Sequence, residues 1–338
     1  MSAALALLLR GCKVTLIERG ETGAESSWAG GGILSPLLPW DYAEPVARLA
    51  LRSMAQYPDW VAAIESRTGL DAEYWRCGMR VVAPVAADAA LAWCAAHDLE
   101  ARLDRDGDLL LAGVAQVRNP RLVAALDAAV RALGGVVHAQ CTATGVETQG
   151  RRATAVRTSR GTFAADSVVL ASGAWAGTGL AGLPGVPGVR PIRGQMLLFK
   201  LAPGVLDTVI YHDGLYLIPR RDGHILVGST LEDAGFDKST DAATAARLHA
   251  AAAALLPALV AAQPVRQWAG LRPGAPDNIP LICRHPDVDN VFVNAGHYRY
   301  GVTMAPASAE LLADLTEGKA PALDPAPYSW AAALARRW

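Results

Sequence analysis

The sequence predicts an α/β fold in which a nucleotide-binding, Rossmann-like domain is interleaved with an antiparallel-sheet α+β domain. Residues 1–18 read as a helix, a glycine turn and a β-branched strand ending in an acid, the second half of a βαβ unit. Residues 167–173 read as a buried parallel strand that closes on a glycine. Residues 191–230 change to alternating strands, two of them joined by an Asp-Gly turn.

Length and charge limit the function classes. A chain of 338 residues suggests two domains, and its 31 basic and 32 acidic residues leave a net charge of -1. No basic excess is available for a polyanion, so we expect no nucleic-acid partner. The arginine pairs 151–152 and 220–221 lie beside Gly or Asp, which predicts solvated hairpin tips.

The cysteines and the apolar segments predict a cytoplasmic protein with no metal and no membrane partner. The five cysteines are odd in number and form no C-x-x-C pair, so we expect reduced thiols. Residues 2–12 superficially resemble a signal peptide, but no basic region precedes them and Arg10 interrupts the apolar run. Residues 250–262 fall short of the ~20 that a membrane span needs. The cysteines are Cys12, Cys77, Cys94, Cys141 and Cys283.

The first strand, Lys13–Ile17, ends at Glu18. A carboxylate there can accept both hydroxyls of a ribose, although an ordinary solvent-facing acid is an equal alternative. In such units a strand and a G-x-G-x-x-G loop precede the helix, because bare backbone must approach a pyrophosphate. Neither precedes residue 1 here, so we expect a start at an internal Met, just after that loop.

The remaining elements follow from hydrophobic periodicity. We expect helices at about 43–68, 86–97, 119–133, 241–256 and 302–317, and strands at 79–85, 136–171, 194–201, 214–230 and 290–296. Because buried, parallel-type strands give way to alternating hairpins, we assign 1–75, 114–188 and 265–338 to the nucleotide-binding domain and 76–113 and 189–264 to the second domain.

Residues 26–34 form a glycine-rich loop in which Ser26 and Ser27 precede three consecutive glycines. Glycines permit close backbone approach, and hydroxyls can bind a phosphate. A flexible surface loop is the alternative, but apolar Trp28, Ile33 and Leu34 would be costly in water. The strand that closes on Gly173 predicts a second approach of the backbone to a dinucleotide.

The segment 293–317 reads as a strand ending at Gly296, a charged aromatic turn at 297–301 and a helix. Free N–H groups at a helix N-terminus suit the oxygen-rich pyrimidine end of a flavin. The alternative is a capped surface helix with an exposed basic turn. Apolar Val293, Val302 and Met304 favour a buried turn, where an arginine needs an anionic partner.

Seven motifs together carry a family resemblance that covers nearly the whole chain. They are CKVTLIERG, AGGGIL, ADSVVLASGAW, PIRGQMLLF, GLYLIPRRDGHILVGST, WAGLRPGAPDNIPLI and GHYRYGVTMAPA. With them the sequence resembles the FAD-dependent glycine oxidases of thiamine biosynthesis, in the D-amino acid oxidase superfamily. The pair WAGLRP and GHYRYG is specific to that branch, whereas many flavoproteins share the strand motifs.

The resemblance implies an FAD/NAD(P)-binding domain of the Rossmann type that holds FAD. The residues implied at the cofactor, together with Gly173, are Glu18, Arg19, Ser26, Ser27, Gly31, Gly32, Ile33, Ala143, His297, Tyr298, Arg299, Tyr300, Gly301, Val302 and Thr303. It places the substrate carboxylate against Arg272, with Tyr216 and Arg299 nearby.

The implied reaction is oxidation of glycine, sarcosine or a small D-amino acid to the imine or 2-oxo acid, with ammonia and hydrogen peroxide. The flavin would carry the hydride chemistry with O2 as electron acceptor, so no catalytic side chain is expected. One alternative is a D-amino acid dehydrogenase that passes electrons to a quinone. Another is an inactive, flavin-free truncated form. A homo-oligomer stays open.

Overall fold

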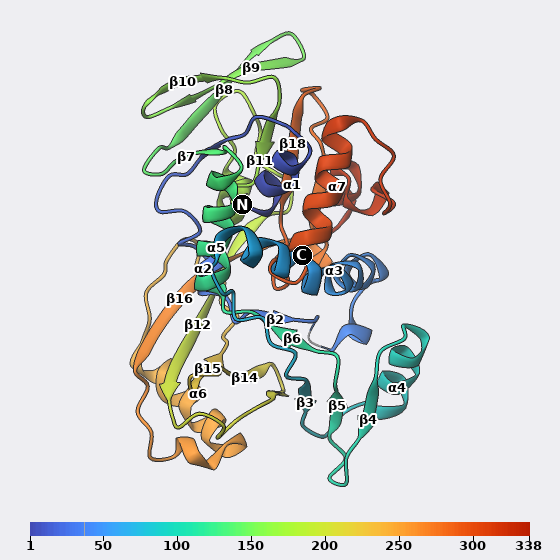
Figure 1. The fold of residues 1–338 in the computed structure, drawn as a ribbon, viewed down its shortest axis with the longest axis vertical. Helices are drawn as coiled ribbons and strands as arrows, with labels where there is room; N and C mark the ends of the chain where they lie inside the picture. The colour runs from blue at the N-terminus through green and yellow to red at the C-terminus, as the bar shows by residue number, and fades with distance from the viewer. Residues whose placement is uncertain (37) are drawn as a thin grey trace.

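The computed structural model describes residues 1–36 and 38–338. Figure 1 shows two parts: small sheets with the long helices around them, and a large sheet at the other end of the molecule. The helices are α1 Ser2–Leu9, α2 Ser26–Ala29, α3 Glu44–Thr68, α4 Ala87–Ala96, α5 Asn119–Ala132, α6 Ala242–Leu255, α7 Ala305–Glu317 and α8 Trp330–Ala335. Short 3-10 turns lie at Pro39–Asp41, Gly173–Thr178, Pro257–Leu259, Pro276–Asn278 and Ala326–Tyr328.

The large sheet has eight strands in the order β16-β12-β15-β14-β13-β3-β5-β4. All neighbours are antiparallel except β13 and β3, which are parallel. The predicted hairpin is confirmed, because β14 and β15 pair around the Asp222–Gly223 turn. The strands are β3 Met79–Val81, β4 Ala101–Leu103, β5 Leu109–Leu111, β12 Arg190–Lys200, β13 Val209–His212, β14 Leu215–Pro219, β15 His224–Gly228 and β16 Arg266–Gly274.

Among the residues that the structure describes, the other strands form four small sheets. β1 (Thr15–Ile17) lies parallel to β7 (Val136–His138), and β2 (Ile33–Leu34) pairs with β6 (Ala115–Gln116). An antiparallel sheet contains β8 Ala143–Gln149, β9 Arg152–Thr158 and β10 Gly161–Ala164. In the last sheet, β18 (Val291–Ala295) lies between β11 (Val168–Leu170), to which it is parallel, and β17 (Leu281–Arg284), to which it is antiparallel. The domain boundary expected at 264/265 falls just before β16, which pairs with β12 along its length.

Three local expectations need correction. Only Val168 is buried in the segment 167–171, because β11 has a strand partner on one edge only within the described residues. The glycine-rich loop contains the short helix α2. Helix α7 begins at Ala305 instead of residue 302, since Pro306 fits the first helical turn and the preceding residues form a separate turn.

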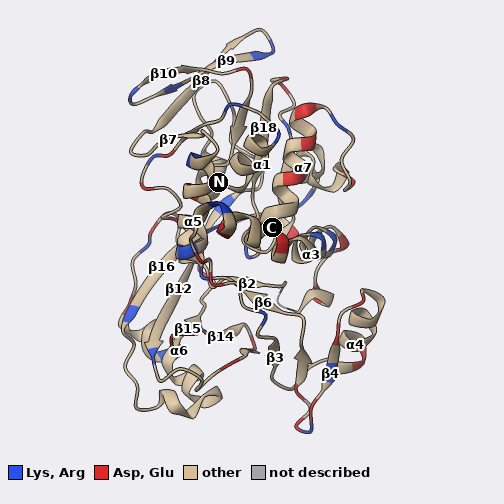
Figure 2. Ribbon diagram, in the orientation of Figure 1, with Lys and Arg blue, Asp and Glu red and all other residues tan. Residues whose placement is uncertain are grey.

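Helix α7 is tied to its neighbours by ion pairs. Arg10 lies 2.7 Å from Asp314 and 2.8 Å from Glu317, and Arg52 lies 2.9 Å from Glu310. The acidic positions follow one another along α7, and elsewhere the two signs of charge are mixed (Figure 2). This mixture gives no broad basic face for a polyanion.

The five cysteines are all free thiols. In the part of the chain that the structure describes, no helix is both long and apolar enough to span a bilayer. The same residues include no group of three or more His, Cys, Asp and Glu side chains arranged to hold a metal ion.

Candidate functional site

A glycine loop, residues 30–33, packs on the large sheet. A Cβ atom on Gly31 would lie 2.5 Å from Cδ1 of Ile218, and a Cβ on Gly270 of β16 would lie 2.5 Å from Cβ of Ala29. Both distances are shorter than real Cβ contacts, so a side chain at Gly31 would displace Ile218 or the loop, and one at Gly270 would push α2 away from the sheet. The glycines therefore bring bare backbone close to β14 and β16.

The glycine loop has anchored carbonyls and free amides. Nη2 of Arg220 donates to the Gly31 carbonyl at 2.8 Å, and the Val117 amide donates to the Gly32 carbonyl at 2.9 Å. No acceptor for the amides of Gly31 and Gly32 is found among residues 1–36 and 38–338. These N–H groups are available to an acceptor outside the chain.

The turn 297–303 is clamped in a similar way. The Tyr298 amide donates to the Pro273 carbonyl at 2.9 Å, Thr303 Oγ1 donates to the Ile33 carbonyl at 3.0 Å, and the Tyr57 hydroxyl donates to the Val302 carbonyl at 2.6 Å. Gly301, Val302 and Thr303 have amides without an acceptor in the described residues. The contact from Thr303 to Ile33 brings this turn beside the glycine loop.

His297 begins this turn. Its Nε2 lies 3.0 Å from Oγ of Ser308, and burial, which disfavours the imidazolium, lowers its pKa to about 4. His297 is therefore neutral near pH 7.

Four further predicted residues gather at the end of β1. The Cys141 amide donates to the Glu18 carbonyl at 2.8 Å, which holds the start of β8, with Ala143, beside Glu18. The Glu18 carboxylate accepts the Gly20 amide at 2.7 Å. Arg19 lies 4.0 Å over the ring of Trp175, in the turn that starts at Gly173.

The two serines before the glycines differ. Oγ of Ser26 donates to the Leu271 carbonyl at 2.8 Å, so its hydroxyl is engaged with β16 and keeps only acceptor capacity. Ser27 is exposed, and its carbonyl accepts Nδ2 of Asn119 at 3.0 Å. Of the two, Ser27 keeps a hydroxyl free to donate.

Free amides in two adjacent loops, with a carboxylate and an arginine at the end of β1, fit a long oxygen-rich ligand such as FAD. The loops would hold the flavin and the pyrophosphate, and Glu18 would hold the ribose. The individual contacts stay predictions.

Arg272 on β16 is fixed from behind. Its Nη1 donates to the Thr230 carbonyl at 3.1 Å and to the Arg193 carbonyl at 3.4 Å, and its Nη2 donates to the hydroxyl of Ser229. The Tyr216 hydroxyl donates to the same Ser229 oxygen at 2.9 Å. The guanidinium crosses β12 where a Cβ on Gly194 would lie 2.1 Å from Nη1, so a side chain at this position would displace the guanidinium.

An acidic network supports the strands behind Arg272. Glu232 pairs with Arg193 and accepts Nε2 of Gln195 at 3.1 Å. The hydroxyl of Thr230 donates to the same carboxylate. Because Glu232 is taken by these partners, it does not neutralise Arg272.

Arg299, the second predicted arginine, is surrounded by tyrosines. Burial acts to lower its pKa, but Tyr300, Tyr42, Tyr216 and Tyr211 outweigh it, and the pKa is raised. Nη1 of Arg299 donates to the Tyr42 hydroxyl at 3.4 Å. Neither Arg272 nor Arg299 forms an ion pair with a carboxylate of the described residues. Two cations around Tyr216 thus have no anionic partner among the residues that the structure describes, which suits a carboxylate ligand.

Sequence reasoning did not identify Ser229, Thr230, Tyr42 or Arg220. Ser229 and Thr230 directly follow β15, and a pair of hydroxyl residues is common after a strand. Nothing in the sequence therefore marks these two as site residues. Arg220 was expected at a solvated hairpin tip, but it is only 3% exposed. Its guanidinium is buried because it crosses to the glycine loop.

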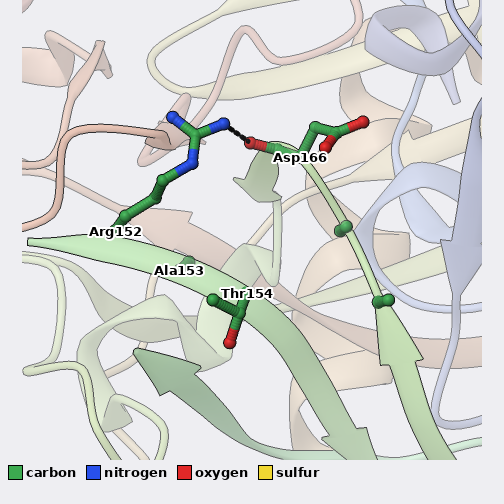
Figure 3. A pocket seen from close by; sticks show the side chains of 6 residues that line it. Arg152, Ala153, Thr154 and Asp166 are labelled. Atoms are coloured by element: carbon green, nitrogen blue, oxygen red, sulfur yellow. Dashed lines mark hydrogen bonds between the residues drawn. The ribbon is translucent and has the colours of Figure 1, made fainter. Parts of the chain in front are cut away.

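A separate open groove lies on the antiparallel sheet of β8, β9 and β10. Its lining residues are Arg152, Ala153, Thr154, Ala164, Ala165 and Asp166, and Nη2 of Arg152 donates to the Asp166 carbonyl at 3.4 Å (Figure 3). Both charged residues are exposed, and no residue of the candidate site lines the groove. We assign it no function.

Comparison with known proteins agrees with this geometry. A glycine oxidase from Pseudomonas aeruginosa is 44% identical, over 97% of this chain and 94% of that one. The Bifunctional protein ThiO/ThiG of Trichormus variabilis is 33% identical over 93% of this chain, which spans 50% of that protein. The crystal structure of glycine oxidase from Geobacillus kaustophilus has a TM-score of 0.90 at 29% identity and covers 97% of this chain and 94% of that chain. The model of the family described as FAD dependent oxidoreductase matches residues 1–315, and the chain belongs to that family of FAD-dependent enzymes.

Proposed function

We propose that this protein oxidises glycine or another small amino acid and passes the electrons to O2. The observation that carries the proposal is the pair of arginines, Arg272 and Arg299, which flank Tyr216 and have no carboxylate partner among residues 1–36 and 38–338, beside backbone amides with no acceptor there. The resemblance to glycine oxidases supports the substrate class. For glycine, the balanced reaction consumes O2 and water and yields glyoxylate, ammonia and hydrogen peroxide.

Arg272 would bind the substrate carboxylate through paired, charge-assisted hydrogen bonds. The Thr230 and Arg193 carbonyls accept from Nη1 and the Ser229 hydroxyl accepts from Nη2, which sets the plane of the guanidinium, so the remaining donors point in a fixed direction. Arg299 and the Tyr216 hydroxyl would complete the carboxylate site. FAD, when bound, supplies the hydride acceptor for the α-carbon that these contacts orient.

No side chain is assigned as a general base. The substrate-binding cluster of Arg272, Arg299 and Tyr216 contains neither an imidazole nor a carboxylate. The arginines favour an anionic carboxylate and disfavour an ammonium, so the substrate amine would enter neutral. We therefore expect the rate of substrate oxidation to rise with pH as the amine loses its proton.

The test is anaerobic reduction of the purified, FAD-loaded protein by glycine, sarcosine, D-alanine and D-proline, followed by admission of air. Bleaching of the flavin absorbance by one or more of these, with rapid recovery and one hydrogen peroxide per amine consumed, supports the proposal. Bleaching without recovery in air, relieved by a quinone, would identify a dehydrogenase instead. If none of the four amino acids bleaches the flavin, small amino acids are excluded as the substrate class.

We also propose that the reaction serves thiamine biosynthesis, as the resemblance to glycine oxidases of that pathway implies. An imine made from glycine provides the linked carbon and nitrogen that a thiazole ring requires. A strain without this gene should need added thiazole for growth, and growth without the supplement would contradict this role.

A further inference from the structure

Arg220 is the buried arginine that the proposed reaction does not use. It follows Pro219 at the end of β14, in the large sheet, yet its side chain reaches residues of the other part of the molecule. Its exposed fraction is 3%, whereas its neighbour Arg221 is exposed. Burying a guanidinium costs free energy, so its hydrogen bonds must compensate for the lost contact with water.

The contacts of Arg220 converge on two backbone segments. Nη1 donates to the Val117 carbonyl at 2.9 Å and to the side-chain carbonyl of Gln116, and Nη2 donates to the Gly31 carbonyl at 2.8 Å. Nε has no partner in the described part of the chain. The guanidinium therefore joins the glycine loop to the end of β6 and to the large sheet.

Arg220 is charged but has no direct counter-ion in the described part of the chain. Glu73 lies near it, but its carboxylate is shared by Arg118 at 3.1 Å and Arg121 at 3.4 Å. Burial lowers the pKa of Arg220 to about 10, so the group is still a cation near pH 7. A positive charge is thus held directly behind the glycine loop.

The hydrogen bond to Gly31 fixes the direction of the next amide. The Gly31 carbonyl and the Gly32 N–H belong to one planar trans peptide and point in opposite directions. When Arg220 holds the carbonyl, the Gly32 N–H must point to the other side, where it has no acceptor in the described residues. A cationic donor on the carbonyl also makes that N–H a stronger donor.

We propose that Arg220 is a positioning residue for FAD, aiming the Gly32 amide at the cofactor and keeping a positive charge behind it. The inference rests on the assignment of the glycine loop to FAD and not on which amino acid is oxidised. It makes the large sheet, which carries Arg272 and Tyr216, responsible for the shape of the cofactor site as well.

The test compares FAD release from three variants of the full-length holoenzyme, Arg220→Met, Arg220→Lys and the matched control Arg221→Met. Arg221 is adjacent and exposed, and its Nη2 donates to the Tyr74 carbonyl at 3.0 Å. FAD fluorescence after serial dilution gives the dissociation constant. We expect about a 10- to 100-fold rise for Arg220→Met, a smaller rise for Arg220→Lys, and less than a twofold change for Arg221→Met.

A second measurement separates positioning from substrate binding. At saturating FAD, the KM for the amino acid should stay within threefold of the parent value in Arg220→Lys, because Arg220 does not contact the carboxylate site. The FAD measurement needs no turnover, so it stands even if none of the tested amino acids is a substrate.

The decisive contrary result is an FAD dissociation constant in folded Arg220→Met that matches the parent, or a rise of equal size in Arg221→Met. If Arg220→Met does not fold, Arg220→Lys decides: it keeps the charge but cannot reach both carbonyls, so parental FAD affinity in it would overturn the proposal.

Discussion

Arg272 has a guanidinium whose plane is set by the Thr230 carbonyl and the Ser229 hydroxyl. A lysine cannot reproduce a planar two-point contact with a carboxylate. We predict that Arg272→Lys raises the KM for the amino acid by roughly 10- to 150-fold, which corresponds to about 1.5–3 kcal/mol for a charged hydrogen bond. Steady-state kinetics at saturating FAD measure this.

The matched control is Arg266→Lys, at the exposed start of the same strand, where the arginine lies 4.7 Å over Trp28. It should leave KM unchanged, and FAD affinity should change little in either variant. A parental KM in Arg272→Lys would remove Arg272 from the substrate site.

His297 links folding stability to pH. Its pKa is about 4 in the folded chain against an ordinary 6.5, so between these values the unfolded chain binds one more proton. Above pH 6.5 the imidazole is neutral in both the folded and the unfolded chain, so His297 does not reduce the free energy of unfolding there. As the pH falls from 6.5 toward 4, the free energy of unfolding decreases by at most about 1.4 kcal/mol per pH unit.

We predict that His297→Asn flattens this dependence, as measured by urea unfolding at pH 7, 6 and 5. His285, whose pKa is also lowered by burial, stays in both proteins, so the difference isolates His297. Equal slopes in parent and variant would show that His297 does not lose this proton on folding.

The contacts of single residues were harder to predict from the sequence than the elements or the fold. Arg272, Tyr216 and Arg299 were predicted through motifs, and in the structure Arg272 and Tyr216 meet at Ser229, with Arg299 near Tyr216. Ser229 and Arg220 act through contacts made by residues remote in sequence, which a linear pattern does not contain. Arginine next to a turn is usually solvated, and only the three-dimensional arrangement shows that Arg220 is not.

At the level of elements, the glycine loop depends on conformations that other residues avoid. Gly32 has a φ of +80°, and a Cβ there would lie 2.1 Å from the Val117 carbonyl oxygen. Gly204 has a similar φ of +84° with nothing within 4 Å. Both substitutions to alanine incur the left-handed cost of ~1–2 kcal/mol, but only Gly32→Ala adds a backbone clash.

We therefore predict that Gly32→Ala loses at least twice as much stability as Gly204→Ala and weakens FAD binding, whereas Gly204→Ala keeps parental affinity. Thermal melts and FAD titration measure the two effects. Equal losses of stability would mean that the loop can shift away from Val117 at little cost.

Helices were predicted well because their apolar periodicity and their caps are local. The segment 43–68 corresponds to α3, and Asp241 caps α6 through the Thr244 amide at 2.7 Å. The start of α7 was placed three residues early, because the sequence of the preceding turn is also compatible with a first helical turn. Those residues belong to the turn predicted to hold the cofactor, and periodicity cannot distinguish such a turn from a first helical turn.

At the level of the molecule, the interleaving of two parts could be predicted because parallel and alternating strands leave different patterns. The membership of β16 could not, because Arg266–Gly274 pairs with β12, a strand far away in the sequence. This pairing has a functional consequence. It carries Arg272 onto the large sheet while Ser26 and Tyr298 bind the neighbouring backbone of β16.

Because the candidate FAD site uses both parts, FAD should stabilise the molecule as one unit. The glycine loop packs on β14, and the turn 297–303 is bound to β16, so releasing either part disrupts the site. At an FAD concentration of 100 times the dissociation constant, linkage predicts about 2.7 kcal/mol of added stability.

We expect a single urea transition that moves to a higher urea concentration when FAD is added, with an unchanged slope. FMN, which lacks the adenosine expected at Glu18 and Arg19, should shift it less at the same concentration. Two separate transitions with only one moved by FAD would show that the cofactor binds to one part alone.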